Sequence, residues 1–109
     1  MPYIVNDVAL ECDEEGYLLE PNYEDDTVAV IAAAENVSLT PTHWLIIQYL
    51  RDVFREEGKT PNFRNMLKDI QEFMPEADSK FLYDLFPIGP AKQAVKIAGL
   101  PKPFGKGGY

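Results

Sequence analysis

Three prolines indicate where helices begin, and these helices make up much of the chain. Pro41, Pro61 and Pro90 each precede a run in which apolar residues recur with helical spacing. Proline fits the first position of a helix, because the N–H that it lacks would have no partner there. We therefore expect a helix to begin at each of these prolines. The helices expected from these starts and from the other apolar runs cover 27–36, 41–57, 61–73, 79–86 and 90–99.

The segment 41–57 has the strongest amphipathic pattern. Its apolar residues recur at i, i+3, i+4 and i+7, the spacing of a helix with one face in a core. Gly58 follows it, and glycine suits the left-handed conformation that ends many helices. We expect this helix to be central to the core. The stripe consists of Ile46, Ile47, Leu50, Val53 and Phe54, with Trp44, Leu45 and Tyr49 beside it.

The first ten residues predict a β-hairpin. Apolar residues 3–5 and 8–10 flank Asn6 and Asp7, two residue types that tolerate the positive φ angles of a tight hairpin turn. An isolated hairpin is marginal in water, so this one must pack on the helices. The expected fold class is mainly α, in a single domain over 1–109.

Charge is distributed unevenly along the chain. Residues 1–50 contain ten acidic residues and no Lys or Arg, although the net charge of the whole chain is only −8. Residues 79–109 contain Asp84 and five lysines, which is a net charge of +4. Such separation can orient a partner and speed encounter, although plain solubility also explains the acidic half.

Residues that could carry chemistry are scarce. His43 is the only histidine and Cys12 the only cysteine, so no Ser/His/Asp set can be built without His43, and a zinc site lacks ligands. The acidic clusters 13–15 and 24–26 do not have the spacing of a calcium loop. We expect His43 to be a surface or half-buried helix residue, Cys12 to be structural, and no metal or cofactor to be bound.

Two of the expected helices also allow a DNA-binding function. Helices 61–73 and 79–86 could form a helix-turn-helix, but 79–86 offers only Lys80 to a DNA phosphate, with Asp84 beside it. We therefore prefer a packing role and expect no nucleic-acid partner.

No apolar run approaches the roughly 18 residues of a membrane helix, and residues 1–7 do not resemble a signal peptide. A cytoplasmic location is expected.

The last third of the chain contains the most specific motif. Residues 86–94 (FPIGPAKQA) and 96–103 (KIAGLPKP) resemble the closing signature of the DsrC/TusE family of sulfur-relay proteins. Residues 13–18 (DEEGYL), 38–44 (SLTPTHW) and 51–52 (RD) are similar to the same family's pattern, so the resemblance covers nearly the whole chain.

The resemblance implies a fold and a mechanism. The fold is a small orthogonal helical bundle with an N-terminal β-hairpin and a mobile C-terminal arm, here 100–109 after a folded body over 1–99. Members of the family carry a cysteine near the end of the arm, and some carry a second one upstream. The thiol holds sulfur as a persulfide, or the two cysteines join through a sulfur bridge. The implied partners are dissimilatory sulfite reductase, small sulfur-transfer complexes and the pathway that thiolates the tRNA wobble uridine.

This chain departs from the family at the reactive positions. Aligned on 96–103, the terminal cysteine position is Lys106 and the upstream position is Val95. An amine cannot replace the thiolate that sulfur transfer requires. Catalytic activity is therefore left open, and we lean toward none. Cys12, surrounded by acidic residues, is not expected to replace the missing thiol.

The hypothesis that follows is a binding protein that regulates or competes with true sulfur carriers. The first alternative is a sulfur carrier or sulfurtransferase component of tRNA 2-thiouridylation or dissimilatory sulfur metabolism, acting through Cys12 or at a step that does not require the arm thiol. The second alternative is a DNA-binding regulator of the helix-turn-helix type. Lys92 and Lys96 share one helix face, and Lys102 continues this basic track. The expected partner-binding residues are Lys92, Lys96, Leu100, Pro101, Lys102, Pro103, Phe104 and Lys106.

Overall fold

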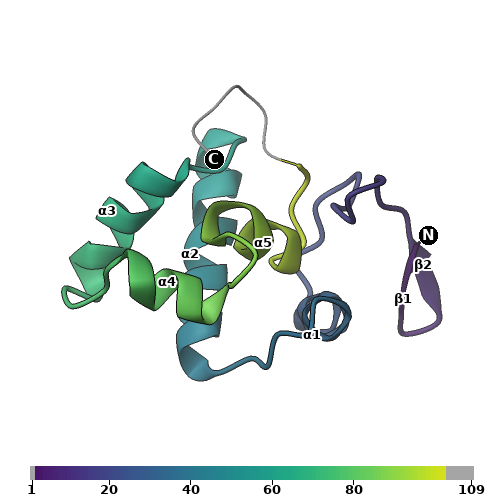
Figure 1. Ribbon diagram of the computed structural model, residues 1–109. Helices are drawn as coiled ribbons and strands as arrows, with labels where there is room; N and C mark the ends of the chain where they lie inside the picture. Colours follow the sequence, from purple (N-terminus) through teal and green to yellow (C-terminus); the bar gives the residue numbers. More distant parts are fainter. Residues whose placement is uncertain (1, 103–109) are drawn as a thin grey trace.

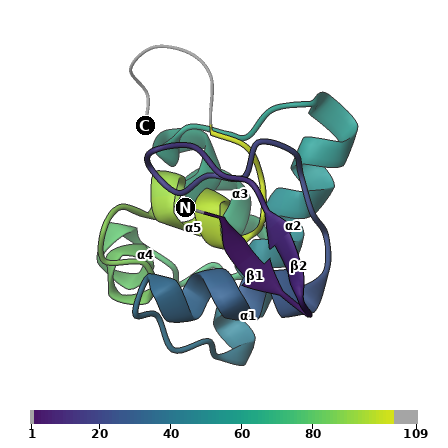
Figure 2. The same ribbon diagram turned by 90° about the vertical axis from the view of Figure 1, so that its right-hand side faces the viewer.

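Helix α5 lies at the centre of the molecule and contacts all four other helices (Figures 1 and 2). The computed structural model describes residues 2–102. Its elements are β1 (Tyr3–Val5), β2 (Val8–Leu10), α1 (Asp25–Ala34), α2 (Pro41–Glu57), α3 (Phe63–Phe73), α4 (Ser79–Leu85) and α5 (Pro90–Ile97). The prediction of a mainly α bundle with an N-terminal hairpin is confirmed.

The hairpin forms at the predicted residues. Strands β1 and β2 pair antiparallel, with Val5 opposite Val8 across the turn. Asn6 and Asp7 have φ angles of 51° and 69°, so both adopt the left-handed conformation that a two-residue turn requires. The hairpin is supported by α1, which contacts β1, and Asn6 donates a hydrogen bond to Asp26 at 2.8 Å.

Helix α2 has the predicted limits at both ends. Thr40 caps its N-terminus: the hydroxyl accepts from the backbone N–H of His43, while His43 Nδ1 accepts from the backbone N–H of Thr40 at 3.1 Å. Gly58 ends the helix with a φ of 72°. Pro41 therefore stands at the first helical position, and so does Pro90 in α5.

The predicted start of α3 is wrong by two residues. Helix α3 begins at Phe63, because Asn62 and not Thr60 caps it: the Asn62 side chain accepts from the backbone N–H of Asn65 at 2.8 Å. Pro61 therefore precedes the cap. The other helices also differ slightly: α1 begins at Asp25, where its two aspartates lie in the first turn.

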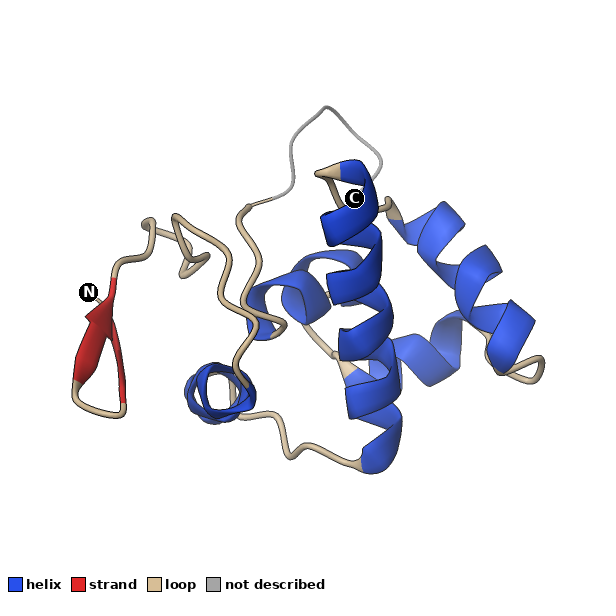
Figure 3. Cartoon of the chain, turned by 180° about the vertical axis from the view of Figure 1, so that it is seen from behind, coloured by secondary structure: helices blue, strands red, loops and turns tan. Residues whose placement is uncertain are grey.

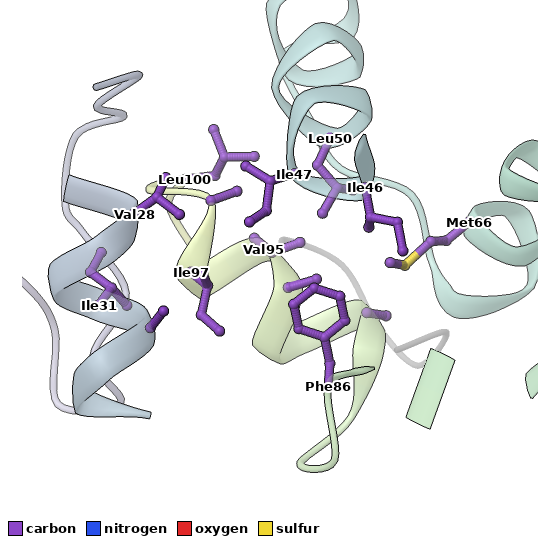
Figure 4. Close-up of a cluster of buried hydrophobic side chains, with 14 of the residues drawn as sticks. Val28, Ile31, Ile46, Ile47, Leu50, Met66, Phe86, Val95, Ile97 and Leu100 are labelled. Carbon is purple, nitrogen blue, oxygen red and sulfur yellow. The ribbon is translucent and has the colours of Figure 1, made fainter. Parts of the chain in front are cut away.

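The core joins α5 to the helices on both of its sides (Figure 4). Ile46, Ile47 and Leu50 of the predicted stripe are fully buried, whereas Leu45 is 53% exposed. The fully buried large apolar side chains include Val28, Ile31, Ile46, Ile47, Leu50, Met66, Ile70, Leu82, Phe86, Ile97 and Leu100. Within residues 2–102, no helix is long and apolar enough to cross a membrane.

Candidate functional site at the base of the C-terminal segment

The end of α5 is held against the loop that precedes α1. The backbone N–H of Asn22 donates to the carbonyl of Gly99 at 2.8 Å, and the N–H of Leu100 donates to the carbonyl of Val95 at 3.3 Å. Gly99 has a φ of +82°, and a Cβ at this position would lie 2.4 Å from the Asn22 oxygen. Only glycine fits both the conformation and the close approach.

Leu100 belongs to the folded body. Its side chain is fully buried in the core beside Val28 and Ile47 (Figure 4). We expected residue 100 to begin an unpacked arm and to offer its side chain to a partner, and this expectation is wrong. Burial of the leucine side chain in the core stabilises the folded state. Pro101 is half-buried and Lys102 is exposed.

Lys102 is paired with an acidic turn from the other end of the chain. Its Nζ lies 2.5 Å from Glu15 Oε1, and this hydrogen bond, with the carboxylate's charge, raises the pKa of Lys102. The turn is held by Asp13, whose carboxylate accepts from the backbone N–H groups of Glu15 at 2.9 Å and Tyr17 at 3.0 Å. The turn thus places Glu15 beside the point where the C-terminal segment leaves the body.

Two partly buried tyrosine hydroxyls support the same turn. Tyr3 donates to the carbonyl of Gly16 at 2.8 Å, and Tyr17 donates to the carbonyl of Lys92 at 3.4 Å. Burial, followed by nearby acidic groups, raises the pKa of each tyrosine to about 12. Both hydroxyls therefore remain neutral donors at physiological pH. Through Tyr17, the turn that holds Lys102 also touches α5 at Lys92.

Lys96 is not free to bind a partner. Its Nζ lies 3.3 Å from Glu35 Oε2 and 5.3 Å from the centre of the Tyr17 ring, and only 15% of its side chain is exposed. Glu35 also accepts from Gln93 at 3.1 Å. The predicted continuous basic track is therefore interrupted, because a largely buried carboxylate needs a counter-charge. Lys92 and Lys102 remain exposed.

Of the two positions where the family resemblance leads us to expect cysteines, the structure describes one. Val95 is fully buried in the core (Figure 4). Lys106 lies outside the described residues, as do Pro103 and Phe104. Cys12 is half-buried and forms an isolated β-bridge with Leu18.

His43 has a structural role. It is 5% exposed, and its ring stands edge-on to Phe86 with 5.1 Å between centroids. Nε2 lies 2.9 Å from the carbonyl of Leu85, which can only accept, so the proton is on Nε2. Nδ1 is then the acceptor for the backbone N–H of Thr40. The histidine therefore ties α2 to the end of α4.

The structure has a pocket at the start of α5 that the sequence analysis did not predict. It is lined by Phe63, Tyr83, residues 88–91 and Lys92, and its volume is about 190 Å³. Tyr83 is 49% exposed and Ile88 is 74% exposed. The available signal was an isoleucine between Pro87 and Gly89, where no helix or strand can bury it. The pocket places exposed apolar side chains next to Lys92.

On α4, the second helix of the helix-turn-helix alternative, Lys80 is the one basic residue. Helices α3 and α4 exist, but Lys80 forms an ion pair with Asp84 at 3.1 Å. Among residues 2–102, no group of three or more His, Cys, Asp or Glu side chains could hold a metal ion.

Comparison with known proteins gives one consistent result. Residues 4–105 match the family model of DsrC-like proteins. The chain is 44% identical to the sulfurtransferase TusE of Escherichia coli over 97 residues, covering 86% of this chain and 89% of that protein. It is 40% identical to the TusE homolog of Haemophilus influenzae, covering 91% and 94%.

Two solved structures are similar over nearly their full length. The NMR structure of DsrC from Allochromatium vinosum has a TM-score of 0.88 and 38% identity, covering 97% of each chain. The crystal structure of the oxidized gamma-subunit of dissimilatory sulfite reductase (DsrC) from Archaeoglobus fulgidus has a TM-score of 0.89 and 35% identity, covering 98% of this chain and 100% of that one.

Proposed function

Because the chain belongs to the DsrC/TusE family of sulfur-relay proteins, we propose that it docks on protein partners of sulfur metabolism without carrying sulfur itself. The partners are dissimilatory sulfite reductase or sulfurtransferase complexes, as the names of its relatives suggest. By occupying them, the protein regulates or competes with relatives that carry sulfur.

One observation carries this proposal: neither position that resembles a family cysteine position holds a thiol. Lys106 stands at the terminal position and Val95 at the upstream one. Sulfur transfer proceeds by attack of a thiolate, which an amine or an isopropyl group cannot replace. Val95 also has no exposed surface, so its side chain serves the core.

The surface around the base of the C-terminal segment supports docking. Lys92 and Lys102 are both exposed, and both adjoin the turn of Glu15 and Tyr17. Beside Lys92, the exposed Ile88 adds apolar area. Exposed cations next to apolar side chains are suited to an acidic partner surface with an apolar centre. We call Lys92, Lys102, Ile88, Tyr83 and Pro101 the docking surface; Pro103, Phe104 and Lys106, which we also propose to bind the partner, lie outside the described residues.

A competition experiment tests the proposal. A persulfide-loaded relative such as Escherichia coli TusE is mixed with its physiological acceptor, and transfer is followed while this protein is added. We expect transfer to slow in proportion to the added protein. The double variant Lys92→Glu/Lys102→Glu is expected to compete at least about tenfold less well.

Lys59→Glu is the matched control, since Lys59 is an exposed lysine beyond the end of α2. It should compete as well as the wild type. Transfer that continues at full rate in a large excess of the wild-type protein would contradict the proposal.

Sulfur transfer through Cys12 remains the other candidate. Cys12 is half-buried and lies close enough to Tyr3 for its charge to contribute to the raised pKa of that tyrosine. Sulfur found on Cys12 after transfer from a loaded partner would favour this function over docking alone.

A further inference from the structure

Helix α2 has a second stripe on the flank that faces away from its core side. The core side contains His43, Ile46, Ile47, Leu50 and Arg51. The second stripe runs from the side opposite the core to the edge of the core side, since each residue turns the helix by about 100°. It consists of Leu45, Gln48, Tyr49, Asp52, Val53 and Glu56, and with Phe73 of α3 it lines an open groove of about 460 Å³.

The floor of this groove is apolar and preformed. Leu45 is 53% exposed and Phe73 is 45% exposed, so two large apolar side chains face solvent at the same place. Tyr49 lies between α2 and α3: its ring centroid is 6.1 Å from that of Phe73, and its hydroxyl donates to Asp69 at 2.5 Å. Burial and this hydrogen bond raise the pKa of Tyr49, so the hydroxyl remains a donor that fixes the ring.

The rim of the groove is acidic. Asp52 and Glu56 line it directly, and the carboxylates of Glu57 and Glu72 are close enough to influence the Tyr49 hydroxyl. Arg55 approaches Asp52 only at 3.9 Å. Within residues 2–102, no salt bridge involves Glu56, Glu57 or Glu72. An exposed apolar floor inside a rim whose carboxylates are largely unpaired has the charge pattern of an interface that selects a basic partner.

We propose that this groove binds an amphipathic helix of a partner protein, with apolar residues at i, i+4 spacing and Lys or Arg on both flanks. Leu45, Tyr49 and Val53 form an i, i+4 ridge, against which the ridge of a second helix packs side by side. The core side of α2 contacts α5, so the groove lies on the flank of α2 away from α5. In the view of Figure 3, α2 is nearer to the reader than α5. The site is therefore separate from the docking surface and does not depend on the proposed function.

The test uses the full chain and a designed peptide. The probe is a fluorescent 18-residue helix with Leu at i, i+4 and i+7 and Lys on its flanks, and binding is measured by anisotropy. A peptide of the same composition in scrambled order, which has no apolar stripe, is the control ligand. We expect the ordered peptide to bind at least about tenfold more tightly, and added salt to weaken it because the rim charges are screened.

Two sets of variants assign the site. Leu45→Ser/Phe73→Ser and Glu56→Lys/Glu72→Lys are each expected to weaken binding about tenfold or more. Leu19→Ser is the matched control, since Leu19 is 59% exposed and does not line the groove. It should bind as the wild type does. Circular dichroism verifies that each variant is folded.

Methyl NMR of the full chain supplies the decisive readout. The peptide should shift the signals of Leu45 and Val53 and leave those of Leu19 unchanged. Equal affinity for both peptides, full binding by the Leu45/Phe73 variant, or shifts confined to another face would overturn the proposal. So would contacts of Phe104 or Tyr109 with Leu45 in the free protein, or dimerisation abolished by the same variants, since these assign the groove to this chain itself.

Discussion

The backbone N–H of Asn22 donates to the carbonyl of Gly99 at 2.8 Å, which joins the loop before α1 to the residue where the C-terminal segment leaves α5. The approach is so close that a Cβ on Gly99 would lie 2.4 Å from the Asn22 oxygen. The position of Lys102 depends on this contact.

Replacing this glycine should be costly. Gly99→Ala places a methyl group against the Asn22 carbonyl in a left-handed conformation, and we expect the free energy of unfolding to fall by about 2–4 kcal/mol. Urea denaturation followed by circular dichroism measures it. Gly58→Ala is the matched control, because Gly58 has a φ of +72° with nothing within 4 Å of the added Cβ. It should cost only about 1–2 kcal/mol, so equal losses would contradict this account.

The ion pair between Lys96 and Glu35 should matter more than the exposed pair on α4. Lys96→Met leaves Glu35, only 18% exposed, without its cation, and we expect a loss of about 2–4 kcal/mol in the free energy of unfolding. Lys80→Met breaks the pair with Asp84, whose side chains are 82% and 65% exposed, and should cost less than about 1 kcal/mol. Thermal and chemical denaturation of both variants compare them. An unchanged free energy of unfolding in Lys96→Met would show that this ion pair does not stabilise the fold.

Stability should decline at alkaline pH because of Tyr3 and Tyr17. Their pKa values are about 12 in the folded protein and near 10 for an exposed tyrosine, so the folded state holds protons that the unfolded chain releases. The contribution is complete below pH 10 and is lost as the pH rises through 12. Tyr17→Phe should flatten this decline in urea titrations at pH 8 to 11. An unchanged slope would mean that the hydroxyl is not held as described.

The pair between Glu15 and Lys102 should affect binding more than folding. Both side chains are 57% exposed, so we expect Glu15→Gln to change the free energy of unfolding by less than about 1 kcal/mol. It should nevertheless raise partner affinity several-fold, because Lys102 becomes available to a partner's carboxylates. Glu14→Gln removes an exposed neighbouring charge that forms no salt bridge within residues 2–102, and it should leave affinity unchanged. Affinity measured by titration calorimetry distinguishes the two.

Sequence patterns predicted which helices and strands form better than they predicted where each helix begins or which elements pack together. The hairpin turn and the limits of α2 depend on local chemistry at Asn6, Asp7, Thr40 and Gly58, which can be recognised without a structure. The start of α3 was missed because Thr60 and Asn62 are both good caps, and only tertiary packing decides between them.

The candidate site was harder to predict. Lys92 and Lys102 could be selected from the sequence, but the partners Glu15 and Glu35 come from distant parts of the chain. No local pattern indicates that Lys96 turns inward or that Leu100 is buried. The groove on α2 was missed for a different reason: we expected Leu45 and Tyr49 to widen the core face, whereas Leu45 lies on the opposite side of the helix and is 53% exposed.

Restoring the thiol should restore sulfur chemistry. Lys106→Cys places a thiol at the position that resembles the terminal family cysteine, so this variant should accept sulfur from a persulfide-loaded partner. Lys59→Cys, an exposed thiol elsewhere, should accept far less in the same time. Intact-mass spectrometry counts the sulfur atoms. Equal loading of the two variants would mean that partners do not direct sulfur to position 106.

The central claim is that the wild-type chain engages sulfur-transfer partners and remains unmodified. Intact-mass spectrometry of the wild-type protein during turnover, with a persulfide-loaded sulfurtransferase and the acceptor present, tests it most directly. The account predicts a mass equal to that of the unmodified chain while transfer between the other components slows. A mass increased by one or more sulfur atoms, removed by a reductant, would contradict it.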